Sequence, residues 1–427
     1  MKPFMMKPLM RHRLPIDMRV LLVALGVALG FSFGLATTQV QAQEKPAVEF
    51  AGSGFLTLGV GKMFGGTRGS VGGYDCPCFA SDYAQAGVYD GRSGLQWKPD
   101  SKLGLQGVVS MDNQRYSLTA QAVSRGARDG KINLEWLYAS ARLNDTLTLQ
   151  IGRKRLPMFY YSDTQDVGVT LPWTHLPPQL YGWEAVNYNG ANLLIKQSIG
   201  SWSLTANVLA GAESIKDAGY DRIYNGRRSR TDAKWNKILG GDLTLQKDWF
   251  ETRFVYIQSD TATRNVTGSW DAATGTFDPT TAATSFTTGQ KQRIFGAAFN
   301  IDYEAWMART EFIHIARPGQ TFKDYASIVG GGRRFGKWQL MLTQSRYWGS
   351  AVVEAGGNPN ALEAHQNRSV TLRYDLTTSS AIKAQLDFQR DQSGPGWGIA
   401  RNGGATNGTD PPYGDARLLS VTYDMVF

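Results

Sequence analysis

Amphipathic runs of about ten residues recur along most of this chain, and they restrict its fold more than any other feature. Within each run, apolar side chains occupy every second position, and mostly polar side chains lie between them. Because alternate residues of a β-strand point to opposite faces, each run predicts a strand with one apolar and one polar face. In the last run, residues 416–427, the apolar face consists of Leu419, Val421, Tyr423, Met425 and Phe427.

The runs predict sixteen strands, an even number, as a single-chain bacterial barrel requires. These strands span residues 48–63, 102–111, 115–124, 132–142, 146–154, 187–197, 201–211, 234–246, 249–258, 291–303, 305–316, 323–334, 337–347, 367–376, 380–390 and 416–427. Short turns alternate with long polar segments, of which the longest are 64–101, 155–186, 212–233, 259–290 and 391–415. A soluble β-sandwich or propeller gives no reason for this alternation. We therefore predict an all-β fold, a transmembrane antiparallel β-barrel whose closure removes both strand edges.

The two faces of each strand predict two environments. Apolar positions that we expect to face lipid include Leu103, Leu105, Leu118, Leu149, Ile151, Val208, Phe254, Phe295, Phe299, Ile382, Leu386 and Phe388. The opposite positions are mostly polar and would line water, among them Ser117, Thr119, Gln121, Asn207, Glu251, Asn300 and Gln385. The lumen of the barrel is therefore predicted to be polar.

The N-terminal 42 residues have the pattern of a cleaved signal peptide. A basic start precedes an uncharged apolar run from Val20 to Ala36, and Val40-Gln-Ala42 fits a small-x-small cleavage site. The alternative is a membrane anchor, but the run is short for a spanning helix. Beyond it no apolar stretch approaches 18 residues, which excludes a helical membrane protein. We predict a signal peptide over 1–42 and one barrel domain over 43–427.

The chain is moderately basic, with a formal net charge of +9 that includes the signal peptide. This excess weakly favours anionic solutes or lipopolysaccharide as partners. It does not indicate nucleic-acid binding, because no basic run with interleaved aromatic residues is present.

Several stretches resemble the sixteen-stranded general trimeric porins of Gram-negative outer membranes. They are Phe55-Leu-Thr-Leu-Gly59, Leu134-Glu-Trp-Leu-Tyr138, Ile151-Gly-Arg153 and the terminal Phe427. The resemblance implies a homotrimer in the bacterial outer membrane, surrounded by lipid and lipopolysaccharide, with Phe427 read by the barrel assembly machinery. It also implies that the segment 155–186 folds inward as a constriction loop, with carboxylates opposite a row of arginines. The family's Pro-Glu-Phe-Gly signature is absent, and Pro157-Met-Phe159 is the nearest stretch.

Candidate constriction residues follow from the resemblance and from the alternation. By resemblance, Arg153 is the wall arginine before the loop, although strict alternation from Ile151 turns it outward; a β-bulge would reconcile the two. Asp163 and Asp166 are the loop acids expected to face the lumen. The full predicted set is Arg115, Glu135, Arg153, Asp163, Asp166, Arg253, Arg309, Arg373 and Lys383. Separated basic and acidic faces would set up a transverse field, with a mild preference for anions.

Catalysis and cofactor binding find little support in the sequence. His175, within the inward segment, is the one histidine worth testing, but no Ser–His frame or His-x-x-x-His spacing accompanies it. Cys76 and Cys78 predict either a local disulfide staple or two free thiols, since a metal would need two further ligands. We expect no enzyme, no cofactor and no metal.

The function predicted from the sequence is therefore a passive diffusion channel for small hydrophilic solutes and ions. One alternative is a substrate-specific channel, with eighteen strands if 64–101 hides a hairpin, in which the aromatic-rich segment 155–186 binds the solute. Another is an adhesin or structural barrel with a plugged lumen.

Overall fold

The computed structural model describes residues 48–427 except 72, 92–93, 272–273, 275, 319–321, 352–362 and 394–413. The predicted signal peptide, 1–42, lies outside the described residues. No helix among the described residues is both long enough and apolar enough to cross a membrane.

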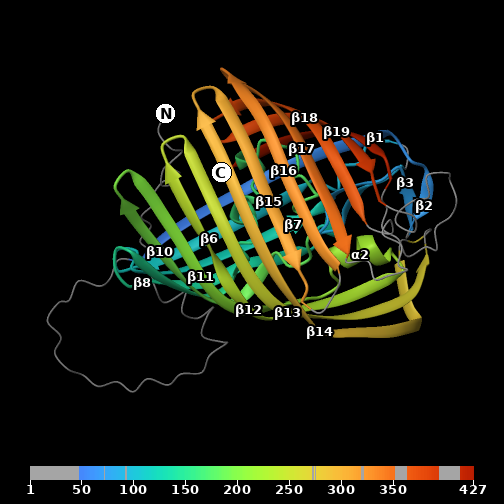
Figure 1. Cartoon of the computed structure of the whole chain (residues 1–427), viewed down its shortest axis with the longest axis horizontal. Helices are drawn as coiled ribbons and strands as arrows, with labels where there is room; N and C mark the ends of the chain where they lie inside the picture. Colours follow the sequence, from blue (N-terminus) through green and yellow to red (C-terminus); the bar gives the residue numbers. More distant parts are fainter. Residues whose placement is uncertain are drawn as a thin grey trace.

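The described residues form a closed barrel of sixteen antiparallel strands, each paired with its neighbours in the chain (Figure 1). The strands are β1 (Glu49–Gly66), β6 (Lys102–Met111), β7 (Tyr116–Arg125), β8 (Ile132–Arg142), β9 (Leu147–Arg155), β10 (Asn187–Ile199), β11 (Trp202–Ile215), β12 (Ser229–Lys247), β13 (Phe250–Asp271), β14 (Thr276–Tyr303), β15 (Trp306–Ala316), β16 (Phe322–Phe335), β17 (Trp338–Ala351), β18 (Ala364–Thr377), β19 (Ser380–Asp391) and β20 (Ala416–Val426). The last strand closes the barrel on the first, with Val426 opposite Phe55. The predicted fold is confirmed.

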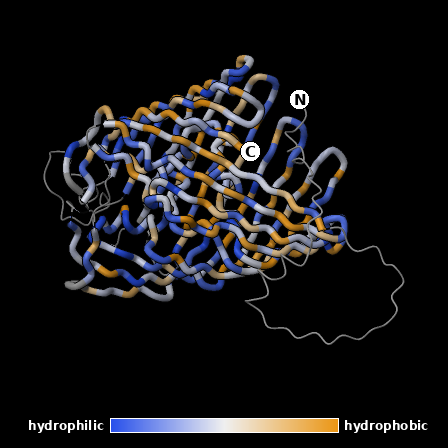
Figure 2. Tube along the Cα trace, turned by 180° about the vertical axis from the view of Figure 1, so that it is seen from behind, coloured by the Kyte–Doolittle hydropathy of each residue, from blue (hydrophilic) through white to orange (hydrophobic). Residues whose placement is uncertain are grey.

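The predicted alternation is visible on the outer surface. Apolar side chains such as Leu105, Val208, Phe295 and Ile382 are exposed on the barrel exterior. In Figure 2, hydrophobic and hydrophilic positions alternate along the strands across the barrel wall. Exposed tryptophans lie beside the short turns, as an interfacial girdle requires: Trp202, Trp249, Trp306 and Trp338.

The segment 64–101 does not add strands to the barrel. It folds into two separate hairpins, β2 (Gly69–Val71) with β3 (Tyr74–Cys76) and β4 (Phe79–Asp82) with β5 (Gly87–Tyr89). The alternative of an eighteen-stranded barrel is therefore wrong. Cys76 and Cys78 form a disulfide within this segment, so the local staple, and not the pair of free thiols, is present.

Two other predicted loops contain regular structure. Helix α2 (Gly219–Asn225) lies between β11 and β12, at the barrel end where β2 and β3 also gather (Figure 1). The predicted loop 259–290 is mostly strand, because β13 and β14 continue to pair as far as Asp271 and Thr276. Its many threonines are β-branched and favour strands, a signal that the apolar pattern alone does not register.

The interior is less polar than the alternation predicts. Inward positions on β13 to β17 carry buried apolar residues, including Ile257, Ile294, Ile313, Ile328 and Met341. They are tolerated inside the barrel because the segment 156–186 folds inward and packs Leu156, Met158, Phe159, Trp173 and Leu180 against them. One part of the lumen wall is thus a hydrophobic core rather than a water-facing surface.

Candidate functional site

The inward loop, residues 156–186, connects β9 to β10 and contains two short turns of 3₁₀ helix, η2 (Ser162–Thr164) and η3 (Gly168–Thr170). Its apolar side chains fill the core described above. Its backbone carbonyls still need hydrogen-bond donors, because this segment has no strand partner there. Basic side chains of the barrel wall supply many of these donors.

Arg253, Arg373 and Lys383 each donate to loop carbonyls. Arg253 donates to the carbonyl oxygens of Tyr160 (3.1 Å) and Pro157 (3.4 Å). Arg373 donates to Val169 (2.7 Å) and Leu171 (3.0 Å). Lys383, which is fully buried, donates to Gly168 (2.9 Å) and to Trp173, and its ammonium lies 3.0 Å from a carboxylate oxygen of Asp424. These predicted pore residues anchor the loop.

Two further wall residues hold the aromatic part of the loop. Arg309 donates to the hydroxyl oxygen of Tyr161 (3.1 Å) and pairs with Asp302 (2.9 Å). Glu311 accepts the backbone N–H of Tyr160 (2.8 Å) and the hydroxyl of Tyr181 (2.6 Å). The loop is therefore fixed from β13, β15, β18 and β19 at once.

Asp166 lies at the centre of a buried charge cluster. Its carboxylate is 2.7 Å from Arg125, 2.6 Å from Arg155 and 3.9 Å from Lys102. Both arginines also reach Glu135, at 2.6 and 3.2 Å. Burial alone would raise the pKa of Asp166, but the three cations lower it well below its ordinary value. The sequence-predicted acids Glu135 and Asp166 are thus brought together, by arginines that were not in the predicted set.

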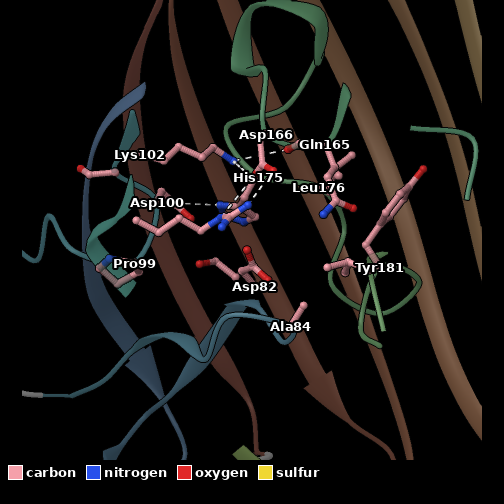
Figure 3. Close-up of a pocket in the computed structure, with 14 residues that line it drawn as sticks. Asp82, Ala84, Pro99, Asp100, Lys102, Gln165, Asp166, His175, Leu176 and Tyr181 are labelled. Atoms are coloured by element: carbon pink, nitrogen blue, oxygen red, sulfur yellow. Dashed lines mark hydrogen bonds and ion pairs between the residues drawn. The ribbon is translucent and has the colours of Figure 1, made fainter. Parts of the chain in front are cut away.

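His175 forms a second buried cluster with two carboxylates. Its Nδ1 atom is 3.1 Å from Asp100, and its Nε2 atom is 3.4 Å from Asp387. Burial alone would lower the pKa of His175, but the two carboxylates raise it by more, from 6.5 to about 10. Residues of both clusters line one cavity of about 40 Å³, in which Lys102 approaches Asp166 and His175 points at Asp100 (Figure 3).

Asp163 occupies a different environment from Asp166. It is exposed, and its charge acts on Lys154 and Asp242 of the facing wall. Lys154 hydrogen-bonds Asn192 (3.1 Å) and lies 4.9 Å from the centre of the Tyr138 ring. This pair of opposite charges lies where the loop faces the wall of β8 to β12. Lys154 was missed, although it shares the inward parity of Gln150.

Arg153 and Arg115 lie away from the Asp166 cluster. Arg153 pairs with Glu213 at 2.8 Å. A bulge that would turn Arg153 inward does not occur in β9, because the pairing of β9 with β8 and β10 is continuous. The backbone of β9 is unusual only in the φ of +139° at Gly152. The register shift lies between β7 and β8, at Glu135. Arg115 belongs to the turn before β7 and is half exposed, so the prediction of a strand beginning at 115 is wrong there.

Three consecutive turn residues explain the position of Arg115. Asp112, Asn113 and Gln114 all have left-handed backbone angles, which form the tight turn and delay the strand to Tyr116. Arg125 and Arg155 were not predicted as site residues, because the predicted strands 115–124 and 146–154 end one residue before each of them.

Among the described residues, no group of three or more His, Cys, Asp or Glu side chains is arranged to hold a metal ion.

No protein-family model and no curated protein sequence matches the chain. Solved structures do match its fold, at 8 to 10% sequence identity. OmpT, an outer membrane protein of Vibrio cholerae, matches with a TM-score of 0.53 over 89% of this chain and 98% of its own, at 8% identity. The anion-selective porin from Comamonas acidovorans gives 0.52 over 89% and 100%, at 10% identity. The outer membrane channel DcaP of Acinetobacter baumannii gives 0.51 over 92% and 100%, at 9% identity. At this identity the likeness establishes the barrel fold alone.

Proposed function

We propose that this chain, which has the barrel fold of outer-membrane porins, is itself a porin of the bacterial outer membrane. It forms a water-filled channel through which small hydrophilic solutes and ions cross by passive diffusion. The observation that carries the proposal is the combination of an apolar barrel exterior with an inward loop held by charged wall residues. A soluble barrel has no use for an apolar exterior. A barrel plugged by its loop would share the inward loop, and conductance distinguishes it from a channel.

The proposal includes a mild preference for anions. What supports it is the basic balance of the chain, a formal net charge of +9, because an excess of positive charge raises the local concentration of anions. The two buried clusters do not add to this excess, since their four cations face four carboxylates.

Passive diffusion is favoured over binding of a specific solute. The aromatic side chains of the loop that could form a solute slide, such as Phe159, Trp173 and Trp183, are buried against the wall. A side chain that already packs on the protein presents little surface to a passing solute. A catalytic role has little support from the site. Both ring nitrogens of His175 face carboxylates, and the hydroxyl of Thr174, 3.3 Å from Nδ1, is buried and also bonded to Ser420.

The further elements of the proposal are those that the porin resemblance implies: removal of residues 1–42 on export, assembly through Phe427 and a homotrimer. Migration of the unheated and the heated protein on a gel, together with light scattering in detergent, tests the subunit number. A single barrel in detergent would contradict the trimer without touching the channel.

Conductance tests the channel itself. Purified protein in a planar bilayer should give stepped, ohmic currents, and the reversal potential in a salt gradient should show anions permeating faster than cations. A plugged barrel gives almost no current, and a substrate-specific channel is blocked by its solute. Absence of steps would overturn the proposal.

A further inference from the structure

Four arginines point outward from four consecutive strands near the long-loop end of the barrel. They are Arg346 of β17, Arg368 of β18, Arg390 of β19 and Arg417 of β20, and all are exposed. Each belongs to the parity of exposed positions on its strand, since the residues on either side of it in β17 and β18, for example, are buried. The arginines therefore lie on the barrel exterior and not in the lumen.

The strand register places these arginines next to an apolar row. Leu342, Val370, Leu386 and Leu419 are paired in sequence across β17 to β20 and are all exposed. Two residues further toward the long loops, the corresponding row is Gln344, Arg368, Phe388 and Arg417. The next row begins with Arg346, Gln366 and Arg390. The surface thus changes from aliphatic to cationic within about 7 Å, the rise of two strand residues.

None of the four positive charges has an acidic partner among the described residues. In the part of the chain that the structure describes, no carboxylate forms an ion pair with any of them, although ion pairs are common elsewhere in the barrel. Asp415, next to this row, instead accepts the backbone N–H of Asp391 (3.1 Å). Diagonal neighbours on adjacent strands lie about 7–8 Å apart, so like charges here repel one another. An anion bound among the four guanidinium groups would relieve this repulsion.

We propose that this surface, the four arginines together with the aliphatic row beside them, binds the phosphorylated headgroup and the acyl chains of an anionic lipid. Guanidinium groups match the geometry of phosphate oxygens, and the spread over four strands suits a headgroup with more than one phosphate. The acyl chains would lie against Leu342, Val370, Leu386 and Leu419. The inference rests on the outer-membrane location proposed above.

The alternatives fit the surface less well. A two-fold contact with a second copy would place the arginines of one copy against those of the other, and a heterologous contact within the proposed trimer would need a different, acidic face of the second copy to cover them. A free phosphate ion would use the arginines but leave the aliphatic row without a role. A lipid uses both features and also explains why the charges lie at the boundary of the apolar band.

Native mass spectrometry of the full-length barrel, purified in detergent, tests the proposal. The probes are hexa-acylated lipid A with both phosphates, the same lipid without phosphates, and inorganic phosphate. We expect the phosphorylated lipid to bind, the dephosphorylated lipid to bind at least about tenfold more weakly, and inorganic phosphate at equal concentration not to displace the lipid. Each single Arg→Gln change should weaken binding about fivefold, and R346Q/R368Q/R390Q/R417Q at least about a hundredfold.

Arg333→Gln is the matched control, because Arg333 is an exposed arginine at the opposite, short-turn end of β16, over the Trp306 ring. It should leave lipid binding unchanged. Heat-dependent gel mobility shows whether each variant folds. The proposal would be overturned if both lipids bound equally, if inorganic phosphate displaced the lipid, or if the quadruple variant bound lipid like the parent. It would also be overturned if the quadruple variant changed the number of subunits but bound lipid as before.

Conductance separates this inference from the proposed channel. The quadruple variant should conduct like the parent, because none of the four side chains faces the lumen. A barrel that binds the phosphorylated lipid through the four arginines but carries no current would refute the channel and leave the lipid site standing.

Discussion

The Nδ1 atom of His175 lies 3.1 Å from Oδ2 of Asp100, and the opposite edge of the same ring faces Asp387 at 3.4 Å. These three residues come from the inward loop, from the segment before β6 and from β19. All three are buried. One imidazolium therefore ties the constriction loop to the barrel wall and to the first long segment, and its charge compensates two buried acids.

Replacing His175 with alanine should destabilise the barrel by about 3–5 kcal/mol, the usual cost of removing one partner from a buried ion pair. The reason is that Asp100 and Asp387 remain buried without their cation. Urea unfolding in detergent measures the loss. His175→Ala should also make single-channel currents noisier, since the loop loses one of its attachments. An unchanged unfolding midpoint would show that the pair contributes no net stability.

The same cluster predicts a pH dependence. Burial lowers the pKa of His175, but Asp100 and Asp387 raise it from 6.5 to about 10, so the protonated ring stabilises the fold fully below about pH 6.5 and loses this effect as pH rises through about 10. Burial raises the pKa of Asp100 and His175 lowers it by more, to below 3.8. Its contribution is therefore present above about pH 4 and is lost in acid. Melting temperatures should fall steeply above pH 9 in the parent and less steeply in His175→Ala; parallel curves would contradict the assignment.

The strands were predictable because each has one face toward lipid and the other toward the barrel interior. A residue such as Val208 or Phe295 that faces lipid must be apolar, so the period of two is enforced over the whole barrel. The start of β7 was predicted one residue too early, at 115, because left-handed angles at Asp112, Asn113 and Gln114 are a local backbone property that the hydrophobic period does not record.

The contacts of the loop could not be predicted in the same way. Lys383 meets the carbonyl of Gly168, and Arg253 meets that of Tyr160, across separations that no local pattern encodes. The alternation along the strands predicted that Arg253, Arg373 and Lys383 point inward. It did not predict that they donate hydrogen bonds to carbonyl oxygens of the loop. Likewise, an inward-facing Ile294 would be unfavourable in a water-filled lumen, and it is accommodated because apolar side chains of the loop pack against it.

Lys383→Met should destabilise the barrel by about 3–5 kcal/mol and loosen the loop. Lys383 is fully buried, and its removal leaves Asp424 uncompensated and the carbonyl of Gly168 without a donor. The double variant Lys383→Met/Asp424→Leu should regain part of this loss, because the buried charge is gone as well. Lys196→Met, at an exposed lysine of β10, is the control. A double variant no more stable than Lys383→Met would argue against the charge pair.

Gly152→Ala should impair folding. Gly152 has a φ of +139°, which L residues rarely adopt, and a Cβ atom there would lie 2.2 Å from the carbonyl oxygen of Leu137. We expect a loss of at least about 2 kcal/mol and a lower yield of heat-modifiable barrel on refolding. Gly331→Ala is the control, since a Cβ there has open space. Equal yields for the two variants would remove the special role of Gly152.

The charges of Asp163, which is exposed, and of Lys154, which is half-buried, should set ion selectivity. Asp163→Lys removes the negative charge at the loop and adds a positive one, so the ratio of anion to cation permeability should rise about twofold or more, whereas Lys154→Glu should lower it. Reversal potentials in a potassium chloride gradient measure the ratio. Low salt concentrations are needed, because the screening length falls from about 10 Å at 0.1 M salt to about 3 Å at 1 M.

Arg115→Glu separates a local field from an effect of net charge. It changes the charge of the barrel by the same amount as Lys154→Glu, but Arg115 lies in a turn at the rim, half exposed and beside Asp112. Solvent screens a charge in that position far more than one between the loop and the wall. The permeability ratio should therefore stay at the parent value in Arg115→Glu while it falls in Lys154→Glu. If both variants shift the ratio equally, the selectivity follows total charge, and the space between Asp163 and Lys154 is not the constriction.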